Sequence, residues 1–179
     1  RLISDISDAS RLDAELSRAE TENVDLGAML SALIEGLIEV GNAGPNCRYQ
    51  YSAAGELSIT GIESRLGQVF ANLLANATSF SPQGGLIEIY ANGENRKDDI
   101  VITIDDHGPG IPQGQQLTIF ERFYSQRPEG EKYGTHSGLG LSISKQIIEA
   151  HQGSIGVENR IDSTGRIIGA RFCIRLPHG

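Results

Sequence analysis

The sequence predicts a two-layer α/β sandwich of the α+β class, in which one mixed sheet is covered by helices on one face and preceded by an N-terminal helix. Segments with apolar residues three and four positions apart indicate helices, and short apolar segments bounded by turn residues indicate strands between them. The chain of 179 residues is long enough for one hydrophobic core and a short appendage. We therefore expect helices and strands to pack as two layers around a single core.

The N-terminal segment predicts a helix that is separate from the main domain. Its apolar positions are Leu2, Ile6, Ala9, Leu12, Leu16 and Ala19. Charged residues fill the gaps between them, so the apolar seam is narrow and suits a coiled coil or a helix bundle. An ordinary surface helix of the main domain is the alternative. A polar break at Thr21–Asn23 places the domain boundary between residues 1–22 and residues 23–179.

The main domain opens with a helix over residues 26–38, which Asp25 can cap and which the segment from Gly41 to Pro45 ends. The broad apolar face of this helix consists of Leu26, Met29, Leu30, Leu33, Ile34, Leu37 and Ile38. Later segments predict strands over residues 48–52, 57–60, 86–91, 100–104, 153–158 and 166–176, and helices over residues 66–79 and 142–151. The connection over residues 108–138 predicts at most a helical turn near residues 117–123, and connections of this length are usually functional.

Composition excludes some classes of protein. The apolar fraction of 39% and the charged fraction of 21% are those of an ordinary soluble protein, and the net charge of −8 argues against nucleic-acid binding, which needs a basic face. Cys47 and Cys173 form no C-x-x-C pair, so we expect buried apolar side chains in a reducing compartment. No apolar run is long enough to cross a bilayer. Because the first residue is Arg1 and not methionine, we expect a fragment with a membrane segment upstream of it. The fragment itself is expected to be cytoplasmic and without direct membrane contact.

The helix over residues 66–79 carries a stripe of amide side chains opposite its core face. The core face consists of Leu66, Val69, Leu73 and Ala77, and the stripe of Gln68, Asn72, Asn76 and Phe80 at i, i+4 spacing. Asparagine is a mediocre helix former, so two of them in mid-helix need an explanation. A solvated polar face and a Mg²⁺ site that uses the Asn76 carbonyl oxygen are about equally good explanations of this segment alone.

The segment I-T-I-D-D-H-G-P-G-I-P places an acid and two glycines directly after a buried strand. Gly108 and Gly110 leave bare backbone that a ligand can approach closely. The Asp106 carboxylate can accept a hydrogen bond from the exocyclic amine of adenine, whereas guanine presents an oxygen there. An ordinary Asp/Gly turn is the alternative, and this motif alone favours it.

A third segment, G-T-H-S-G-L-G-L-S-I-S-K-Q-I, leads three glycines into an amphipathic helix. The unpaired amides at the start of such a helix can hold phosphate oxygens, and the helix dipole helps them. The segment is not a Walker loop, because no Gly-Lys dipeptide occurs in the chain.

Taken together, these segments resemble in order and spacing the N box, first glycine box, F box and second glycine box of sensor histidine kinase ATP-binding domains. The matching stretches are N-L-L-A-N-A with Asn72 and Asn76, D-x-G-x-G-I from Asp106 to Ile111, F-x-x-F with Phe120 and Phe123, and G-L-G-L from Gly138 to Leu141. The resemblance covers residues 24–177 and depends on four motifs at once.

The resemblance implies the Bergerat fold, with ATP bound beneath a mobile lid and Mg²⁺ held by Asn76. The candidate nucleotide-binding residues are Asn72, Asn76, Phe80, Asp106, Gly108, Gly110, Ile111, Tyr124, Arg127, Ser137, Gly138, Leu139, Gly140 and Leu141. We expect the lid over Glu121–Ser137 to order only with nucleotide, because its few apolar residues cannot offset the entropy of ordering it.

The resemblance also implies a reaction and its partners. In this family the γ-phosphoryl group of Mg-ATP moves to a histidine of the dimerisation hairpin, then to an aspartate of a response regulator receiver domain. The opening residues of the chain resemble the end of that hairpin. No histidine here lies in a phosphoacceptor motif, so we expect no autophosphorylation by the chain alone; His107 and His136 are expected near the nucleotide, and His151 and His178 are expected to be structural. The full-length protein is expected to be a homodimer anchored in the bacterial inner membrane.

Some positions differ from the family pattern. Relatives of the gyrase, mismatch-repair and chaperone type have a water-activating glutamate where this chain has Asn72, and an amide cannot accept a proton at neutral pH, which favours a kinase over an ATP-hydrolysing machine. Ser79 and Ser125 stand where many kinases have a base, and Arg127 is a candidate replacement. A non-catalytic docking module switched by nucleotide therefore stays as an alternative.

Overall fold

A computed structural model describes residues 19–41, 47–95, 99–122, 124 and 138–179 of the chain. The predicted helix at the N-terminus lies outside these residues, apart from its last position. In the described residues a five-stranded mixed sheet has the order β2 (Arg48–Gly55), β4 (Leu86–Gly93), β5 (Ile100–Asp105), β7 (Ile167–Leu176) and β6 (Ser154–Ile161). β2 runs parallel to β4, and the other neighbours are antiparallel.

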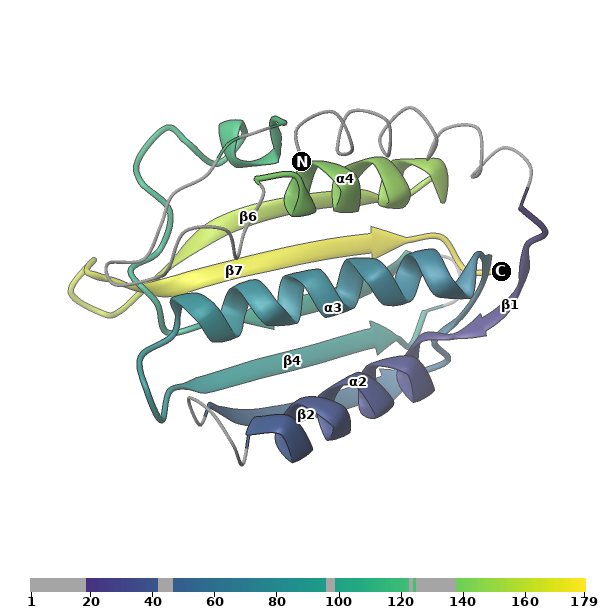
Figure 1. Cartoon of the computed structure of the whole chain (residues 1–179), viewed down its shortest axis with the longest axis horizontal. Helices are drawn as coiled ribbons and strands as arrows, with labels where there is room; N and C mark the ends of the chain where they lie inside the picture. The colour runs from purple at the N-terminus through teal and green to yellow at the C-terminus, as the bar shows by residue number, and fades with distance from the viewer. Residues whose placement is uncertain (1–18, 42–46, 96–98, 123, 125–137) are drawn as a thin grey trace.

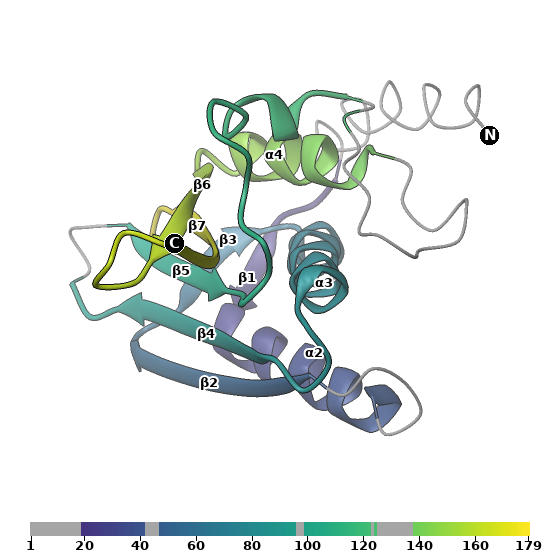
Figure 2. The ribbon, with the colours of Figure 1, turned by 90° about the vertical axis from the view of Figure 1, so that its left-hand side faces the viewer.

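The helices α2 (Leu26–Gly41), α3 (Glu63–Phe80) and α4 (Gly140–Ala150) lie side by side on one face of the sheet (Figure 1), and the view from the side shows the two layers (Figure 2). The predicted sandwich is therefore confirmed. A short 3-10 helix, η1 (Thr118–Phe120), falls where at most a helical turn was predicted. No helix in the described ranges is long and apolar enough to cross a membrane.

The core lies between the sheet and the helices. Along β5 the side chains of Ile100, Ile102 and Ile104 are fully buried, and those of Val101 and Thr103 between them are only partly buried. Successive side chains of a strand point to opposite faces of its sheet, so the isoleucines contact the helices and the intervening residues lie on the open face. This alternation places the charged residues of neighbouring strands together on the open face.

The predicted start of α2 and the predicted core faces of α2 and α3 are largely confirmed, whereas α3 begins at Glu63, three residues before its predicted start. The Ala28 backbone N–H donates to Asp25 Oδ1 at 3.0 Å, so Asp25 does cap α2. The assignment of Ile38 to the apolar face of α2 is wrong, because Ile38 is 48% exposed although Ile34, one turn earlier, is buried. The neighbouring Leu37 still packs against the core, and Ile38 lies about 100° further round the helix, beyond the edge of the buried face. In α3 the four predicted core residues are buried, and Phe70 is buried with them.

Part of the polar break at Thr21–Asn23 forms a strand that the sequence did not predict. Glu22 and Asn23 belong to β1 (Glu22–Asp25), which pairs antiparallel with β3 (Ser58–Gly61) in a second, two-stranded sheet. Only Val24 of β1 is buried, opposite Ile59. One buried residue in four gives no periodic signal, and the strand exists because β3 supplies its backbone partners. The proposed boundary after residue 22 falls inside β1 and stays a prediction.

Candidate functional site

Asn72 and Asn76, one turn apart on α3, have different surroundings. The Asn72 side-chain amide donates a hydrogen bond to Ser144 Oγ on α4 at 3.0 Å, and Ser144 is buried. The Asn76 side chain is half-buried, and it has no hydrogen bond to any other residue that the structure describes. Asn72 is therefore already engaged in holding α4, whereas the Asn76 oxygen is available to a ligand.

The start of α4 lies directly against Asn72. A Cβ atom on Gly140 would collide with the Asn72 side-chain oxygen, so the close approach requires glycine. Gly138 has a φ of +71°, a left-handed conformation that also favours glycine. Leu139 precedes the helix and provides no side-chain cap. The N-cap residue therefore offers no side-chain acceptor to the first backbone amides of α4. Unpaired amides at the start of a helix can bind phosphate oxygens.

Asp106 follows β5 and is buried, with 4% of its surface exposed. Its Oδ1 accepts hydrogen bonds from the backbone N–H groups of Gly108 at 2.8 Å and Ala170 at 3.0 Å. Oδ2 takes part in neither bond, so one carboxylate oxygen is left for a ligand. Burial raises the pKa of Asp106, while the two backbone hydrogen bonds and then the charge of Arg160 act in the opposite direction.

The loop from Asp106 to Ile111 lies against the end of α3. A Cβ atom on Gly108 would lie 2.7 Å from the Phe80 carbonyl oxygen, so this approach requires glycine. Phe80 and Asn72 are eight residues apart, or about 12 Å along a helix that rises 1.5 Å per residue. The loop therefore meets α3 at one end of this span, α4 begins at the other end, and Asn76 lies midway.

The aromatic residues near η1 attach this segment to the core. The buried Phe120 packs edge-to-face on Phe172, with ring centroids 6.4 Å apart, and Lys145 Nζ lies 6.0 Å from the Phe120 centroid. The Tyr124 hydroxyl donates to Gln115 Oε1. Phe123, Arg127, Ser137 and His136, with most of the expected lid, lie outside the described residues.

Two histidines have structural partners. His107 Nδ1 lies 2.7 Å from the Leu86 carbonyl oxygen, which ties the start of the loop to β4. His151 Nε2 accepts from the Ile62 N–H at 3.0 Å, and its Nδ1 lies 2.7 Å from the Ile147 carbonyl oxygen. The prediction of a structural role is confirmed for His151.

Three residues that contact the site were not found from the sequence: Ser144, Asn159 and Arg160. Ser144 reads as an ordinary helix residue. Asparagine is disfavoured in strands, so Asn159 within β6 was a usable signal for a special role. Arg160 lies on the open face of the sheet, where a long charged side chain needs no explanation.

Comparison with known proteins assigns this arrangement to a family. Residues 61–179, more than half of the chain, match the family described as histidine kinase-, DNA gyrase B-, and HSP90-like ATPases. The chain belongs to this family. Within it, the sensor protein ChvG of Rhizobium meliloti is 44% identical over the whole chain, which spans 32% of that relative. The chain thus spans about a third of the length of this curated relative.

Solved structures give the same assignment. The mycobacterial sensor histidine kinase MprB is 27% identical with a TM-score of 0.74, over 88% of this chain and 97% of that one. Histidine kinase ThkA, solved in complex with the response regulator protein TrrA, shares the fold at 22% identity and a TM-score of 0.71, over 99% of this chain and 49% of that one. The chain is an ATP-binding catalytic domain of the sensor histidine kinase type, and the predicted fold and function are confirmed at this level.

Proposed function

We propose that the site along α3 binds Mg-ATP, and that the whole protein transfers the γ-phosphoryl group to a histidine of its own dimerisation hairpin and from there to an aspartate of a response regulator. One observation carries this proposal, namely the order of groups along α3. The Asp106 loop lies beside Phe80, the uncommitted amide of Asn76 follows, and the start of α4 lies beside Asn72. This order matches a ligand with a base at one end and phosphates at the other.

The base-binding role falls to the Asp106 loop. Asp106 Oδ2 is free of the two hydrogen bonds that hold Oδ1, so it can accept one from the exocyclic amine of adenine. Guanine would place an oxygen against this carboxylate and leave both groups without a partner, which is costly in a buried site. The site should therefore prefer adenine nucleotides.

Mg²⁺ fits the residues that are present. Asn76 offers an amide oxygen with no hydrogen bond to the described residues, and Mg²⁺ prefers oxygen ligands shared with phosphates and water. When bound, Mg²⁺ neutralises charge on the phosphate oxygens. The uncapped N-terminus of α4 would hold the same phosphates through its amides and dipole.

Asn72 supports a kinase over a hydrolase. Its amide cannot take a proton from water, and its hydrogen bond to Ser144 leaves the side chain in a fixed orientation. The nucleotide would thus be held without rapid hydrolysis until an acceptor arrives. The ThkA–TrrA complex, in which a protein of the same fold is solved with a response regulator, supports the proposed regulator partner.

The test uses γ-labelled ATP with the chain alone and with a supplied dimerisation hairpin. We expect label on the hairpin histidine, none on the chain alone, and almost no free phosphate. Binding of Mg-ATP without transfer to the hairpin would instead indicate a docking module. Steady phosphate release without an acceptor would indicate an ATPase and contradict the proposed role of Asn72.

A further inference from the structure

Asn159 of β6 holds the far end of the Asp106 loop through both groups of its side chain. Its Oδ1 accepts from the Ile111 N–H at 2.6 Å, and its Nδ2 donates to the Ile111 carbonyl oxygen at 2.7 Å. A paired residue of a neighbouring strand makes the same two bonds to a backbone. Because Ile111 lies in no strand, one amide side chain takes the place of a β-sheet neighbour.

Gly110 allows the loop to lie close to Asn159. Its φ of +75° is left-handed, and a Cβ atom there would lie 2.7 Å from Asn159 Oδ1 and 2.5 Å from the Ile167 side chain. The loop can therefore approach β6 closely enough for both Ile111 bonds only with glycine at this position.

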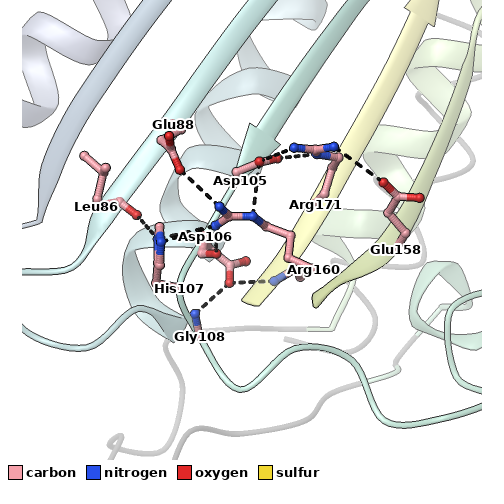
Figure 3. A network of polar contacts seen from close by, with 10 residues as sticks. Leu86, Glu88, Asp105, Asp106, His107, Gly108, Glu158, Arg160 and Arg171 are labelled. Carbon is pink, nitrogen blue, oxygen red and sulfur yellow. Dashed lines mark hydrogen bonds and ion pairs between the residues drawn. The ribbon is translucent and has the colours of Figure 1, made fainter. Parts of the chain in front are cut away.

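Arg160, the next residue, holds the near end of the loop. Its Nη1 donates to the Asp106 carbonyl oxygen at 2.8 Å and lies 3.4 Å from His107 Nδ1. Figure 3 shows the guanidinium of Arg160 between His107, Glu88 and Asp105. Only 17% of the Arg160 side chain is exposed, and Nη2–Glu88 Oε2 and Nε–Asp105 Oδ2 distances of 3.2 Å each fix its orientation.

The two side chains reach the loop from opposite faces of the sheet, because successive residues of a strand alternate. The β6–β7 register shifts between Arg160 and Ile161, directly after the pair. Register shifts of this kind change the direction in which the side chains of a strand point. The same two residues thus contact both ends of one loop, between which Gly108 and Gly110 lie.

We propose that Asn159 and Arg160 are positioning residues for base recognition: they hold the two ends of the loop from Asp106 to Ile111 in the shape that presents the free Asp106 oxygen to adenine. This inference rests on the proposed nucleotide site. Arg160 has a second effect, since its positive charge near the buried Asp106 favours the ionised carboxylate against the effect of burial.

The first experiment removes the Asn159 bonds. Asn159→Ala should weaken metal-free binding of adenosine and of ADP by the same factor, about tenfold, because the loop contacts the base and not the phosphates. Hydrogen exchange of the Ile111 amide should become faster in this variant. Asn92→Ala is the matched control, since among the described residues the Asn92 side chain accepts a hydrogen bond from the Glu94 N–H of its own turn and from no other group, so neither quantity should change.

The second experiment separates charge from geometry at Arg160 through the pH profile of ADP binding. The charged or titratable groups that act on Asp106 are Arg160 from β6 and His107 on its own loop, and Arg160 in turn is paired with Asp105 at the end of β5. Arg160→Ala should move the acid limb of the profile to higher pH and lower the affinity at neutral pH. Arg160→Lys keeps the charge and should restore the position of the limb but not the full affinity.

Arg171→Ala is the control for both Arg160 variants. Arg171 binds Asp105 and Glu158 in the same network but donates no hydrogen bond to the loop, so the acid limb should stay in place. Wild-type protein that binds no ADP would reject the nucleotide site itself. Loss of ADP binding in Asp106→Ala, with wild-type affinity and pH profile in Asn159→Ala and Arg160→Ala, would reject the positioning role alone.

Discussion

The side-chain amide of Asn72 donates a hydrogen bond to the buried hydroxyl of Ser144, and this bond joins the middle of α3 to the first turns of α4. It connects the segment that we assign to the metal with the segment that we assign to the phosphates. The strength of this hydrogen bond and the close approach of Gly140 to the Asn72 side chain can be measured separately.

The first prediction concerns the bond itself. Ser144→Ala leaves the Asn72 amide without its partner in a half-buried position, so the free energy of unfolding should fall by about 1 kcal/mol. Urea denaturation of Asn72→Ala, Ser144→Ala and the double variant gives the coupling between them. Purely additive effects would mean that the bond contributes nothing to stability.

The second prediction concerns Gly140. Gly140→Ala should destabilise the domain by about 1–3 kcal/mol, because the new methyl group collides with the Asn72 side chain. In an Asn72→Ala background the collision disappears, and the better helix propensity of alanine should then stabilise α4 by up to about 1 kcal/mol. Thermal unfolding of the four combinations tests this change of sign. If alanine destabilises equally in both backgrounds, Asn72 is not the obstacle.

The third prediction is that the buried Asp106 carboxylate lowers the free energy of unfolding of the ligand-free domain. Burial raises the pKa of Asp106 above the ordinary value of 3.8, so the folded state binds the proton of this carboxyl group more tightly than the unfolded chain does. The cost of the charge is present above the raised pKa and vanishes below 3.8. Asp106→Asn should therefore stabilise the ligand-free domain at pH 7, and the gain should shrink as the pH falls towards 4.

The same variant should bind adenine nucleotides about ten- to a hundred-fold more weakly, because one hydrogen bond to a charged acceptor is lost. Unfolding in urea at the two pH values and calorimetry with ADP measure the two effects. A variant that is less stable than wild type at neutral pH would contradict the pKa argument, whatever its affinity.

The fourth prediction separates metal binding from base binding. Asn76→Ala should weaken ADP binding more strongly with Mg²⁺ than without it, because it removes an oxygen ligand and leaves the Asp106 loop intact. Calorimetry in magnesium and in chelator measures the difference. Gln68→Ala, on the same stripe but exposed two turns away, is the control. Equal losses with and without magnesium would exclude Asn76 as the ligand.

The sequence predicted those parts of the fold whose signal lies within one segment. The periodicity of α3 identified its core residues, and the Asp25 cap identified the start of α2. β1 was missed because its only reason to be a strand is the backbone of β3. Ile38 was misplaced because periodicity does not show where the edge of the buried face of a helix lies.

The candidate site shows the same limit. Asn76, Asp106 and the glycines became candidates because they stand in motifs, but the residues that contact them did not. Asn159 lies 48 positions from Ile111, and Ser144 lies 72 positions from Asn72. Such pairs are created by the packing of β6 and α4 against distant segments, so a local pattern such as an asparagine within a strand can mark a residue as unusual but cannot name its partner.

The hydrogen bond from the Ala170 backbone to Asp106 bears on biosynthesis. A chain that has emerged from the ribosome only as far as the end of α4 already exposes Asn76, Asp106 and Gly140, but β7 and the residues that hold the loop have not yet emerged. Closing β5 against β7 means joining segments that are far apart in the sequence, which is slow compared with forming a helix. We therefore expect nascent chains to be unable to capture nucleotide until β7 has emerged, and to gain that ability abruptly once β7 is free to pair.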